Sequence, residues 1–201
     1  RAGVGGGQGP AGACGTLFGM WAAEGQLTEA KRWNRVKLAA QARNYSLANS
    51  LVQGLTTLGP QGRLLIDVAQ KPELLDQPSR FTPVNDAMSD VVSLGLRRLA
   101  RQDPDQAMAL LDDYAQRMHF SRDEKVAIAR EIGLTLARRY DPRALDLMTG
   151  YDPELRDNTV SEWRMRLLLR LGRWEDAYEL SRRLPKDLSD SSRWRYWQAR
   201  S

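Results

Sequence analysis

Pairs of carboxylates are the groups in this sequence whose spacing comes nearest to catalytic chemistry, because enzymes that cut sugar chains act through two such groups. None of these pairs has the expected surroundings of a catalytic acid. All fall beside predicted helix caps or on polar helix faces, where carboxylates are solvated and ionised. The sequence therefore predicts no catalytic residue among them. The pairs are Glu124 with Glu131, Asp112 with Asp113, and Glu175 with Asp176.

Metal ligands are equally scarce, because Cys14 is the only cysteine and His119 the only histidine in the sequence. A zinc cluster of cysteines and histidines is thereby excluded, and the sequence predicts neither a metal nor another cofactor. His119 lies just before Ser121, at a turn between two predicted helices. In that place a histidine that caps or packs is more common than a catalytic base without a partner.

Arginine carries most of the positive charge, and 30 Lys and Arg outnumber 25 Asp and Glu to give a net charge of +5. Such an excess helps a protein approach an anionic polymer, whether nucleic acid, lipid headgroups or an acidic cell-wall glycan. The simpler interpretation is a set of solvated helix faces with ion pairs, because acidic residues are interspersed throughout. The candidate anion-binding residues are Arg164, Arg166, Arg170 and Arg173 beside one apolar stripe, and Arg193 and Arg195 among aromatic residues.

The aromatic residues around Arg193 and Arg195 are Trp194, Tyr196 and Trp197. They could stack on nucleobases or sugar rings while the arginines bind anions. At helical spacing, however, Trp194 and Trp197 more commonly pack between helices. Arginine stems beside an apolar stripe can likewise simply cover a helix edge. Both interpretations stay open.

The opening residues 1–12 are rich in glycine and lack apolar periodicity, which predicts a disordered segment. A phosphate-binding loop would need a preceding strand and a Gly-Lys-Ser/Thr ending, and neither is present. The chain has no initiating Met and no run of 18 apolar residues. No membrane span is therefore expected, and any export signal would lie upstream.

After the opening segment the apolar spacing is helical, and nothing alternates as it would in a strand. Thr28 predicts the start of a helix that runs to about Arg43. Asp103 and Asp141 each precede a proline, which predicts an N-cap followed by Pro at the first helical position. Residues 121–124, Ser-Arg-Asp-Glu, have the pattern of a capping box.

Helix pairs begin at regular intervals near Asn85, Arg122, Asp157 and Ser189, which are 37, 35 and 32 residues apart. A period of about 34 residues with two helices per unit is typical of tetratricopeptide-like α-solenoids, in which each pair buries its apolar face against the next. The expected fold class is therefore all-α, an α-superhelix or solenoid of antiparallel helix pairs.

Apolar stripes define the face that each helix is expected to bury. They place Trp163 and Trp174 in the core, and Gly172 is expected to end the helix before Trp174. Residues after Ser189 predict a first helix whose partner would lie beyond Ser201. The two clearest stripes are Ala107, Leu110, Leu111, Tyr114, Ala115 and Met118, and Val160, Trp163, Leu167, Leu168 and Leu171.

Two segments go beyond a general helical pattern. Residues 13–25, Ala-Cys-Gly-Thr-Leu-Phe-Gly-Met-Trp-Ala-Ala-Glu-Gly, resemble the Ala-Cys-x-x-Leu-Phe-x-x-Trp-x-x-x-Gly segment of the soluble lytic transglycosylases. Residues 35–39, Arg-Val-Lys-Leu-Ala, and 42–44, Ala-Arg-Asn, follow as in that family. Residues 192–199, Ser-Arg-Trp-Arg-Tyr-Trp-Gln-Ala, resemble a second family landmark, in the family's order and at about its separation.

The resemblance implies part of a periplasmic enzyme, a peptidoglycan lyase that releases anhydro-muropeptides. In that family a ring-shaped α-superhelix carries a C-terminal lysozyme-like catalytic domain. The marks of that domain, a Glu-Ser pair and a Gly-Leu-Met-Gln run, do not occur in this sequence, so no catalytic residue can be carried over. The resemblance also pairs Cys14 with a cysteine further upstream, which this chain does not contain.

The resulting prediction is a disordered segment over residues 1–12 and one α-superhelical, ring-type domain over residues 13–201, truncated at its C-terminal end. Its expected role is a scaffold that holds peptidoglycan glycan strands near a catalytic domain, with no nucleic-acid partner. The alternative is a tetratricopeptide-like adaptor that binds peptide segments and has no enzyme attached.

Overall fold

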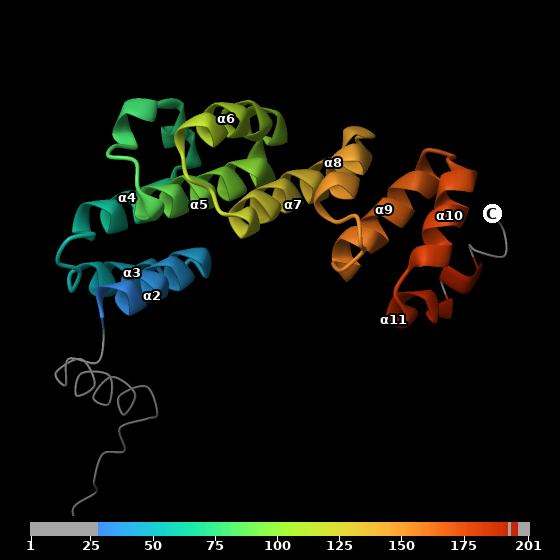
Figure 1. The fold of residues 1–201 in the computed structure, drawn as a ribbon, viewed down its shortest axis with the longest axis horizontal. Coiled ribbons are helices and arrows are strands. Elements are labelled where there is room, and N and C mark those ends of the chain that lie inside the picture. Colours follow the sequence, from blue (N-terminus) through green and yellow to red (C-terminus); the bar gives the residue numbers. More distant parts are fainter. Residues whose placement is uncertain (1–27, 193, 197–201) are drawn as a thin grey trace, which may run out of the picture. The chain divides into compact units, whose positions relative to one another are not determined.

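The computed structural model describes residues 28–192 and 194–196. Within these residues the chain consists of α-helices and two short 3-10 helices joined by loops, without a strand, so the predicted all-α class is confirmed. The chain divides into two compact units, Arg1–Ile66 and Asp67–Ser201. Figure 1 shows their helices in sequence colours. The glycine-rich segment and the predicted helix around Cys14 lie outside the described residues.

The first unit contains α2 (Glu29–Gln41), α3 (Tyr45–Val52) and the beginning of α4 (Gly59–Gln70), which ends in the second unit. α2 and α3 pack against each other. As predicted, Thr28 is the N-cap of α2, and its hydroxyl oxygen accepts a hydrogen bond from Lys31 N–H. The helix ends at Gln41 rather than Arg43.

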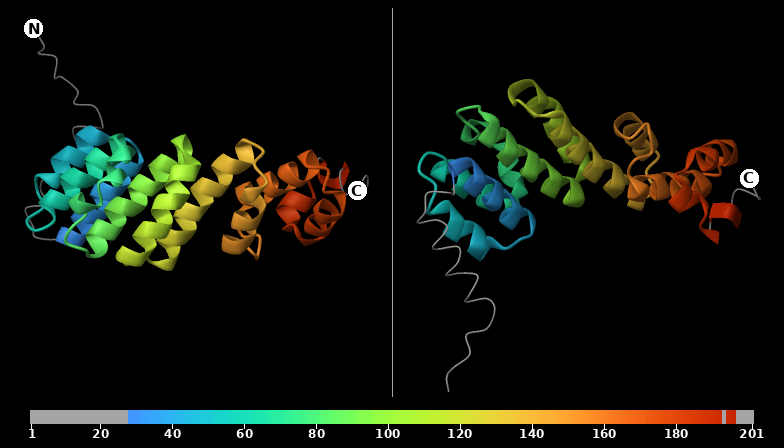
Figure 2. Two further views of the ribbon diagram at one scale, coloured as in Figure 1. Left: turned by 90° about the horizontal axis from the view of Figure 1, so that it is seen from above. Right: turned by 60° about the horizontal axis from the view of Figure 1, so that its bottom comes forward.

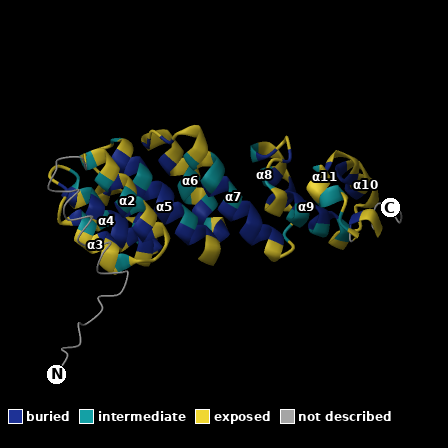
Figure 3. Cartoon of the chain, turned by 90° about the horizontal axis from the view of Figure 1, so that it is seen from below, coloured by how far each residue is buried: buried dark blue, intermediate teal, exposed yellow. Residues whose placement is uncertain are grey.

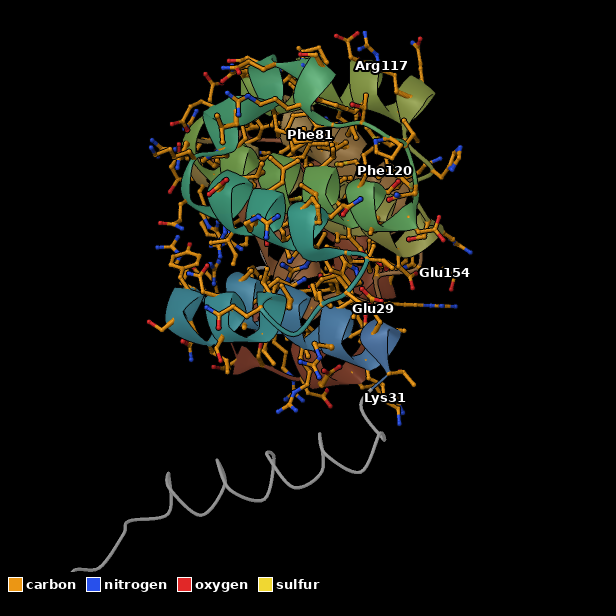
Figure 4. The ribbon with its side chains drawn as sticks, turned by 90° about the vertical axis from the view of Figure 1, so that its left-hand side faces the viewer. Glu29, Lys31, Phe81, Arg117, Phe120 and Glu154 are labelled. Carbon is orange, nitrogen blue, oxygen red and sulfur yellow. The ribbon has the colours of Figure 1, made fainter. Side chains whose placement is uncertain are left out.

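Glu29 ties the start of α2 to the turn before α4. Its carboxylate accepts hydrogen bonds from the Thr56 hydroxyl and from the backbone N–H groups of Thr57 and Leu58, at 2.7, 2.7 and 2.9 Å. The bond from Thr56, followed by the one from Leu58, lowers the pKa of Glu29 to about 2. Glu29 and its neighbour Lys31 are labelled in Figure 4.

The second unit is a series of short helices arranged in pairs. Its elements after α4 are η1 (Pro72–Asp76), η2 (Pro78–Arg80), α5 (Asp86–Gln102), α6 (Pro104–Arg117), α7 (Arg122–Arg138), α8 (Arg143–Tyr151), α9 (Asn158–Arg170), α10 (Trp174–Arg183) and α11 (Lys186–Ser189).

These pairs stack as a solenoid requires. Each first helix packs on its own partner, in the pairs α5 with α6, α7 with α8, and α9 with α10. The first helices also pack on one another, α5 on α7 and α7 on α9, as Figures 1 and 2 show. They begin at Asp86, Arg122 and Asn158, at intervals of 36 and 36 residues. The predicted array is confirmed, with a more regular period than the sequence suggested.

Side-chain caps explain why the first helices of the pairs begin at regular intervals. Asn85, Asp103 and Asp157 cap α5, α6 and α9 through their side chains, and the capping box of Ser121 opens α7 as predicted. The prediction for Asp141 is off by one position, because α8 begins at Arg143. The Asp141 carboxylate accepts hydrogen bonds from both the backbone N–H and the guanidinium of that arginine.

The core of the second unit lies along α5 and α7, where buried residues concentrate in Figure 3. Gly95 of α5 permits a close approach, since a methyl group there would lie 2.3 Å from Val68 Cγ1 and 3.0 Å from Leu75 Cδ1. Tyr114 of α6 packs edge-on against Phe81, with ring centroids 5.6 Å apart. Phe81 lies among the helices in Figure 4, whereas Arg117 is at their outer edge.

The two tryptophans predicted to be core residues are less buried than expected. Trp163 is half-buried, with the guanidinium of Arg166 stacked 5.0 Å from its ring centroid. Trp174 is 46% exposed, so its assignment to the core is wrong. Side chains on a helix lean toward its N-terminus, and Trp174 is the first residue of α10. Its ring therefore extends past the packed part of the helix.

Gly172 ends α9 in the left-handed backbone conformation, with φ of +69°. We therefore expect the backbone to require glycine at this position. Its N–H bonds to Leu169 O and the next N–H to Leu168 O, the pattern of a Schellman motif. Gly172→Ala is expected to lower the free energy of unfolding by about 1 kcal/mol, the cost of a left-handed alanine.

Gly150→Ala is the matched control, because Gly150 lies inside α8 with open space around its Cα. That change is expected to raise the free energy of unfolding by about 0.5–1 kcal/mol. Urea denaturation of both variants measures the difference, and shifts of the same sign would contradict the backbone argument.

Candidate functional site

Charged side chains gather where α5, α7 and the start of α9 face one another. α5 contributes Arg97 and Arg101, α7 contributes Arg130 and Glu131, and Asp157 is the N-cap of α9. These five residues are called the arginine network below. Because α5 packs on α7 and α7 on α9, the stacking of successive helix pairs brings them together.

Glu131 is the most buried member of the network, with 8% of its surface exposed. Its two oxygens accept hydrogen bonds from Nε and Nη2 of Arg101, both at 2.9 Å. Burial alone raises the pKa of Glu131, but the bond and charge of Arg101, with the charges of Arg97 and Arg130, lower it below its ordinary value. Glu131 therefore stays ionised at neutral pH and cannot act as a general acid there.

Asp157 joins α7 to the start of α9. One carboxylate oxygen accepts a hydrogen bond from Arg130 Nε, and the other accepts the N–H groups of Thr159 and Val160 at 3.0 and 3.2 Å. Burial raises the pKa of Asp157, while the Arg130 bond and these backbone donors outweigh it and lower the pKa. Asp157 is thus a second carboxylate of the network that is charged at neutral pH.

Among the described residues, Arg97 is the arginine of the network that has no hydrogen bond to a carboxylate. Its Nε is buried without a hydrogen-bond partner among the described residues. Burial lowers its pKa, the neighbouring Arg101 and Arg130 lower it further, and the attraction of Glu131 opposes them. Three guanidinium groups against two carboxylates leave the network with one net positive charge. Its ionised groups offer no acid and base pair for proton transfer at neutral pH, and the excess positive charge is compatible with an anionic ligand.

The predicted candidates Arg166, Arg170 and Arg195 are partly or fully exposed and already have neighbours. Arg166 Nη2 donates to Glu162 Oε2 at 2.9 Å, and the guanidinium of Arg170 lies 5.3 Å from the ring centroid of Tyr140. Arg195 is paired with Asp190 at 3.2 Å. Arg193 lies outside the described residues. Among the described candidates, Arg166 and Arg170 lie one turn apart on α9, whereas Arg195 belongs to the segment after α11.

Arg164, the remaining candidate of that set, is buried instead of lying on the helix edge. Arg173, the other candidate beside the same apolar stripe, is exposed at the start of α10. It forms an ion pair with Asp176 at 2.6 Å. Trp194 is buried, as its core interpretation predicts, and Tyr196 is exposed.

The carboxylate pairs behave as predicted except for Glu131. Asp112, Asp113, Glu175 and Asp176 are exposed. Glu124 accepts the N–H of Ser121 in the capping box. Glu131 was expected on a solvated face but is buried, because α5 and its Arg101 cover it. His119 is exposed in the turn before α7, and its backbone N–H donates to Ser89 Oγ.

Sequence reasoning missed the arginine network as a group. A usable signal exists, because Arg101 and Glu131 are 30 residues apart and Arg130 and Asp157 are 27 apart, somewhat less than one repeat of 36 residues. Opposite charges separated by about one repeat are candidates for contact between stacked helices.

A surface groove of the second unit lies between the start of α7 and the loop before α9, and the network residue Asp157 is part of its lining. Its charged lining is mixed, and Glu154 at its edge points outward in Figure 4 and pairs with Arg156. The Tyr151 hydroxyl is buried there without a hydrogen-bond partner among the described residues. The groove is lined by Arg122, Asp123, Val126, Tyr151, Asp152, Pro153, Glu154, Arg156, Asp157, Asn158 and Thr159.

Among solved structures, the chain is similar to an inactive mutant of the lytic transglycosylase Slt from Pseudomonas aeruginosa. The two are 66% identical, with a TM-score of 0.90 over 98% of this chain and 32% of that one. This chain resembles an N-terminal region of soluble lytic transglycosylases. The resemblance expected from the two sequence segments is confirmed.

Two further comparisons agree with this finding. The soluble lytic murein transglycosylase of Escherichia coli strain K12 is 26% identical over 190 residues, 93% of this chain. The crystal structure of the 70 kDa soluble lytic transglycosylase from Escherichia coli is 23% identical over 94% of this chain, with a TM-score of 0.71, which supports the fold. No family model matches the chain.

The chain corresponds to only part of the length of these relatives. The chain spans 29% of the length of the murein transglycosylase and 31–32% of the two solved chains. In the part of the chain that the structure describes, no helix is both long enough and apolar enough to cross a membrane.

Proposed function

We propose that this chain is the superhelical scaffold of a periplasmic lytic transglycosylase, a lyase that cleaves peptidoglycan strands to anhydro-muropeptides. In this proposal catalysis belongs to a lysozyme-like domain elsewhere in the whole protein. The observation that carries the proposal is the 66% identity to the Pseudomonas aeruginosa enzyme over 98% of this chain.

The role of the scaffold is to hold a glycan strand near the catalytic domain. Weak contacts on a rigid helical array raise the local concentration of a strand, which adds to its affinity for the active site. Peptidoglycan carries acidic groups, and the arginine network has one net positive charge, with Arg97 not hydrogen-bonded to a carboxylate among the described residues. Arg97 is therefore the residue of the network through which we expect an anionic strand to be held.

Sedimentation with purified peptidoglycan sacculi tests the proposal. The chain is expected to sediment with sacculi at low ionic strength, to be released as salt screens the charges, and to remain in solution with the neutral glycan cellulose. Arg97→Gln is expected to reduce the bound fraction several-fold. Arg117→Gln removes the same charge from the outer edge of α6 and is expected to leave binding unchanged.

Two results would count against the proposal. Equal recovery with sacculi and cellulose, or no binding to either, would remove the support for a glycan-guiding role. Binding of the chain to peptide segments alone would favour the adaptor interpretation instead.

A further inference from the structure

Arg164 of α9 is a charged side chain in an apolar position. It is 7% exposed, although its neighbours on the helix face, Val160 and Leu168, are apolar core residues. Within the described part of the chain, its hydrogen bond is from Nη1 to the backbone oxygen of Asp152, at 3.3 Å. It forms no ion pair there, unlike Arg101 and Arg130 of the arginine network.

The carboxylate that attracts Arg164, that of Asp152, already accepts hydrogen bonds from the backbone. Asp152 attracts Arg164 electrostatically, but its own oxygens accept the backbone N–H groups of Arg156 and Asp157 at 2.8 and 3.2 Å. Burial lowers the pKa of Arg164, and repulsion from Arg183 adds to this effect. A buried guanidinium without a paired carboxylate is costly for a fold, and such groups are retained mainly where they bind something.

Arg164 opens into a pocket between α8, α9 and α10. The pocket has a volume of about 220 Å³, which suits a small group rather than a whole sugar chain. Its lining comprises Leu145, Asp146 and Thr149 from α8, Arg164 and Leu168 from α9, Arg173 at the N-cap of α10, and Asp176, Glu179, Leu180 and Arg183 from α10.

We propose that this pocket binds the free carboxylate of a peptide, with the Arg164 guanidinium as its main partner. The planar guanidinium matches a carboxylate, and binding would give Arg164 the hydrogen-bonded carboxylate partner that it does not have among the described residues. Arg183, which donates one hydrogen bond to Pro153 O, adds a second positive charge to the lining. The inference goes beyond the scaffold role and does not depend on it.

The charges around the pocket favour a carboxylate over a phosphate. Three arginines and three acidic residues line it, so the lining is neutral in sum. Arg173 is held by Asp176 at 2.6 Å and is therefore less available to a ligand. A phosphate dianion would be repelled by Asp146 and Glu179. The end of a peptide carries a single negative charge beside an amide N–H. Its carboxylate can bind the arginines of the lining, and its N–H can donate to the acidic residues.

Calorimetric titration with N-acetyl-alanyl-alanine tests the proposal. The free acid is expected to bind with saturation, and its C-terminal amide at least tenfold more weakly, since the amide lacks the charge that Arg164 requires. Inorganic phosphate is expected to bind more weakly than the acid. Equal binding of acid and amide, tighter binding of phosphate, or no heat from the acid up to about 20 mM, an affinity too weak for a specific ion pair, would overturn the proposal.

A matched pair of variants identifies the residue. Arg164→Met is expected to abolish acid binding while leaving the melting temperature unchanged or higher, because it replaces a buried unpaired charge by an apolar side chain. Arg166→Met makes the same change on the opposite face of α9, at a residue paired with Glu162. It is expected to change affinity less than twofold. Equal losses in the two variants would contradict the assignment, and the comparison of acid with amide decides the question without either variant.

Discussion

Tyr114→Ala is expected to lower the free energy of unfolding by about 3–5 kcal/mol, the cost of deleting a large aromatic side chain from a packed core. Tyr114 is 2% exposed and packs edge-on against Phe81. Its hydroxyl donates a hydrogen bond of 2.8 Å to the buried oxygen of Leu75 in η1. The variant therefore loses aromatic packing and leaves a buried carbonyl without its donor. Urea denaturation followed by circular dichroism measures the change.

Tyr114→Phe separates these two losses. It keeps the ring and removes the donor, so the expected cost is about 1–3 kcal/mol. Tyr178→Ala is the exposed control, since Tyr178 is 39% exposed and its ring stacks on Arg182. It should cost clearly less than Tyr114→Ala. Similar costs for the two alanine variants would mean that α6 does not pack against η1 as described.

Glu131→Gln is expected to cost about 2–4 kcal/mol at neutral pH, because it leaves Arg101 without its bonded carboxylate and removes a charge that offsets the repulsion among Arg97, Arg101 and Arg130. The lower end of this range reflects Arg101, whose side chain is 45% exposed and partly compensated by water. Chemical denaturation at pH 7 provides the measurement. Arg156→Gln is a control on a solvated pair, because the side chains of Arg156 and its partner Glu154 are 82% and 65% exposed.

The cost of Glu131→Gln should depend on pH. The folded-state pKa of Glu131 lies below the value of about 4.3 for an unfolded glutamate, so its stabilising effect is complete above that pH. The effect is lost as the pH falls through the folded pKa, where the carboxylate gains a proton. The difference between wild type and variant should therefore shrink in acid. A constant difference between pH 7 and pH 3 would show that charge does not explain it.

Much of the fold could be predicted because its signals are local. Caps at Ser121 and Asp157, and the left-handed glycine at 172, depend on side chains within a few residues, and the repeat period depends on their spacing. The exposure of Trp174 could not be predicted from the apolar stripe on its helix. The stripe gives the face of a helix, whereas burial also depends on whether a neighbouring element reaches that end of the helix.

Charged residues were harder to place than apolar ones. Arg164 and Glu131 both lie on helices where a polar residue is expected to face water, yet both are buried. Their burial follows from what packs over them: α5 supplies Arg101 to cover Glu131, and the loop at Asp152 supplies a carbonyl to Arg164. Such partners lie between 12 and 30 residues away in the sequence. Periodicity within a single helix contains no information about them.

The stacking of helices in chain order also determines how the second unit can fold. Its main helix contacts join elements that are next, or next but one, along the chain, so the loops closed during folding are short. Contacts of this kind are associated with fast folding, and each completed pair presents a surface on which the next can form. The α5 and α6 pair can thus begin to fold before α9 has been synthesised. Assembly can then proceed from the N-terminal side as the chain emerges, without waiting for a distant segment to return.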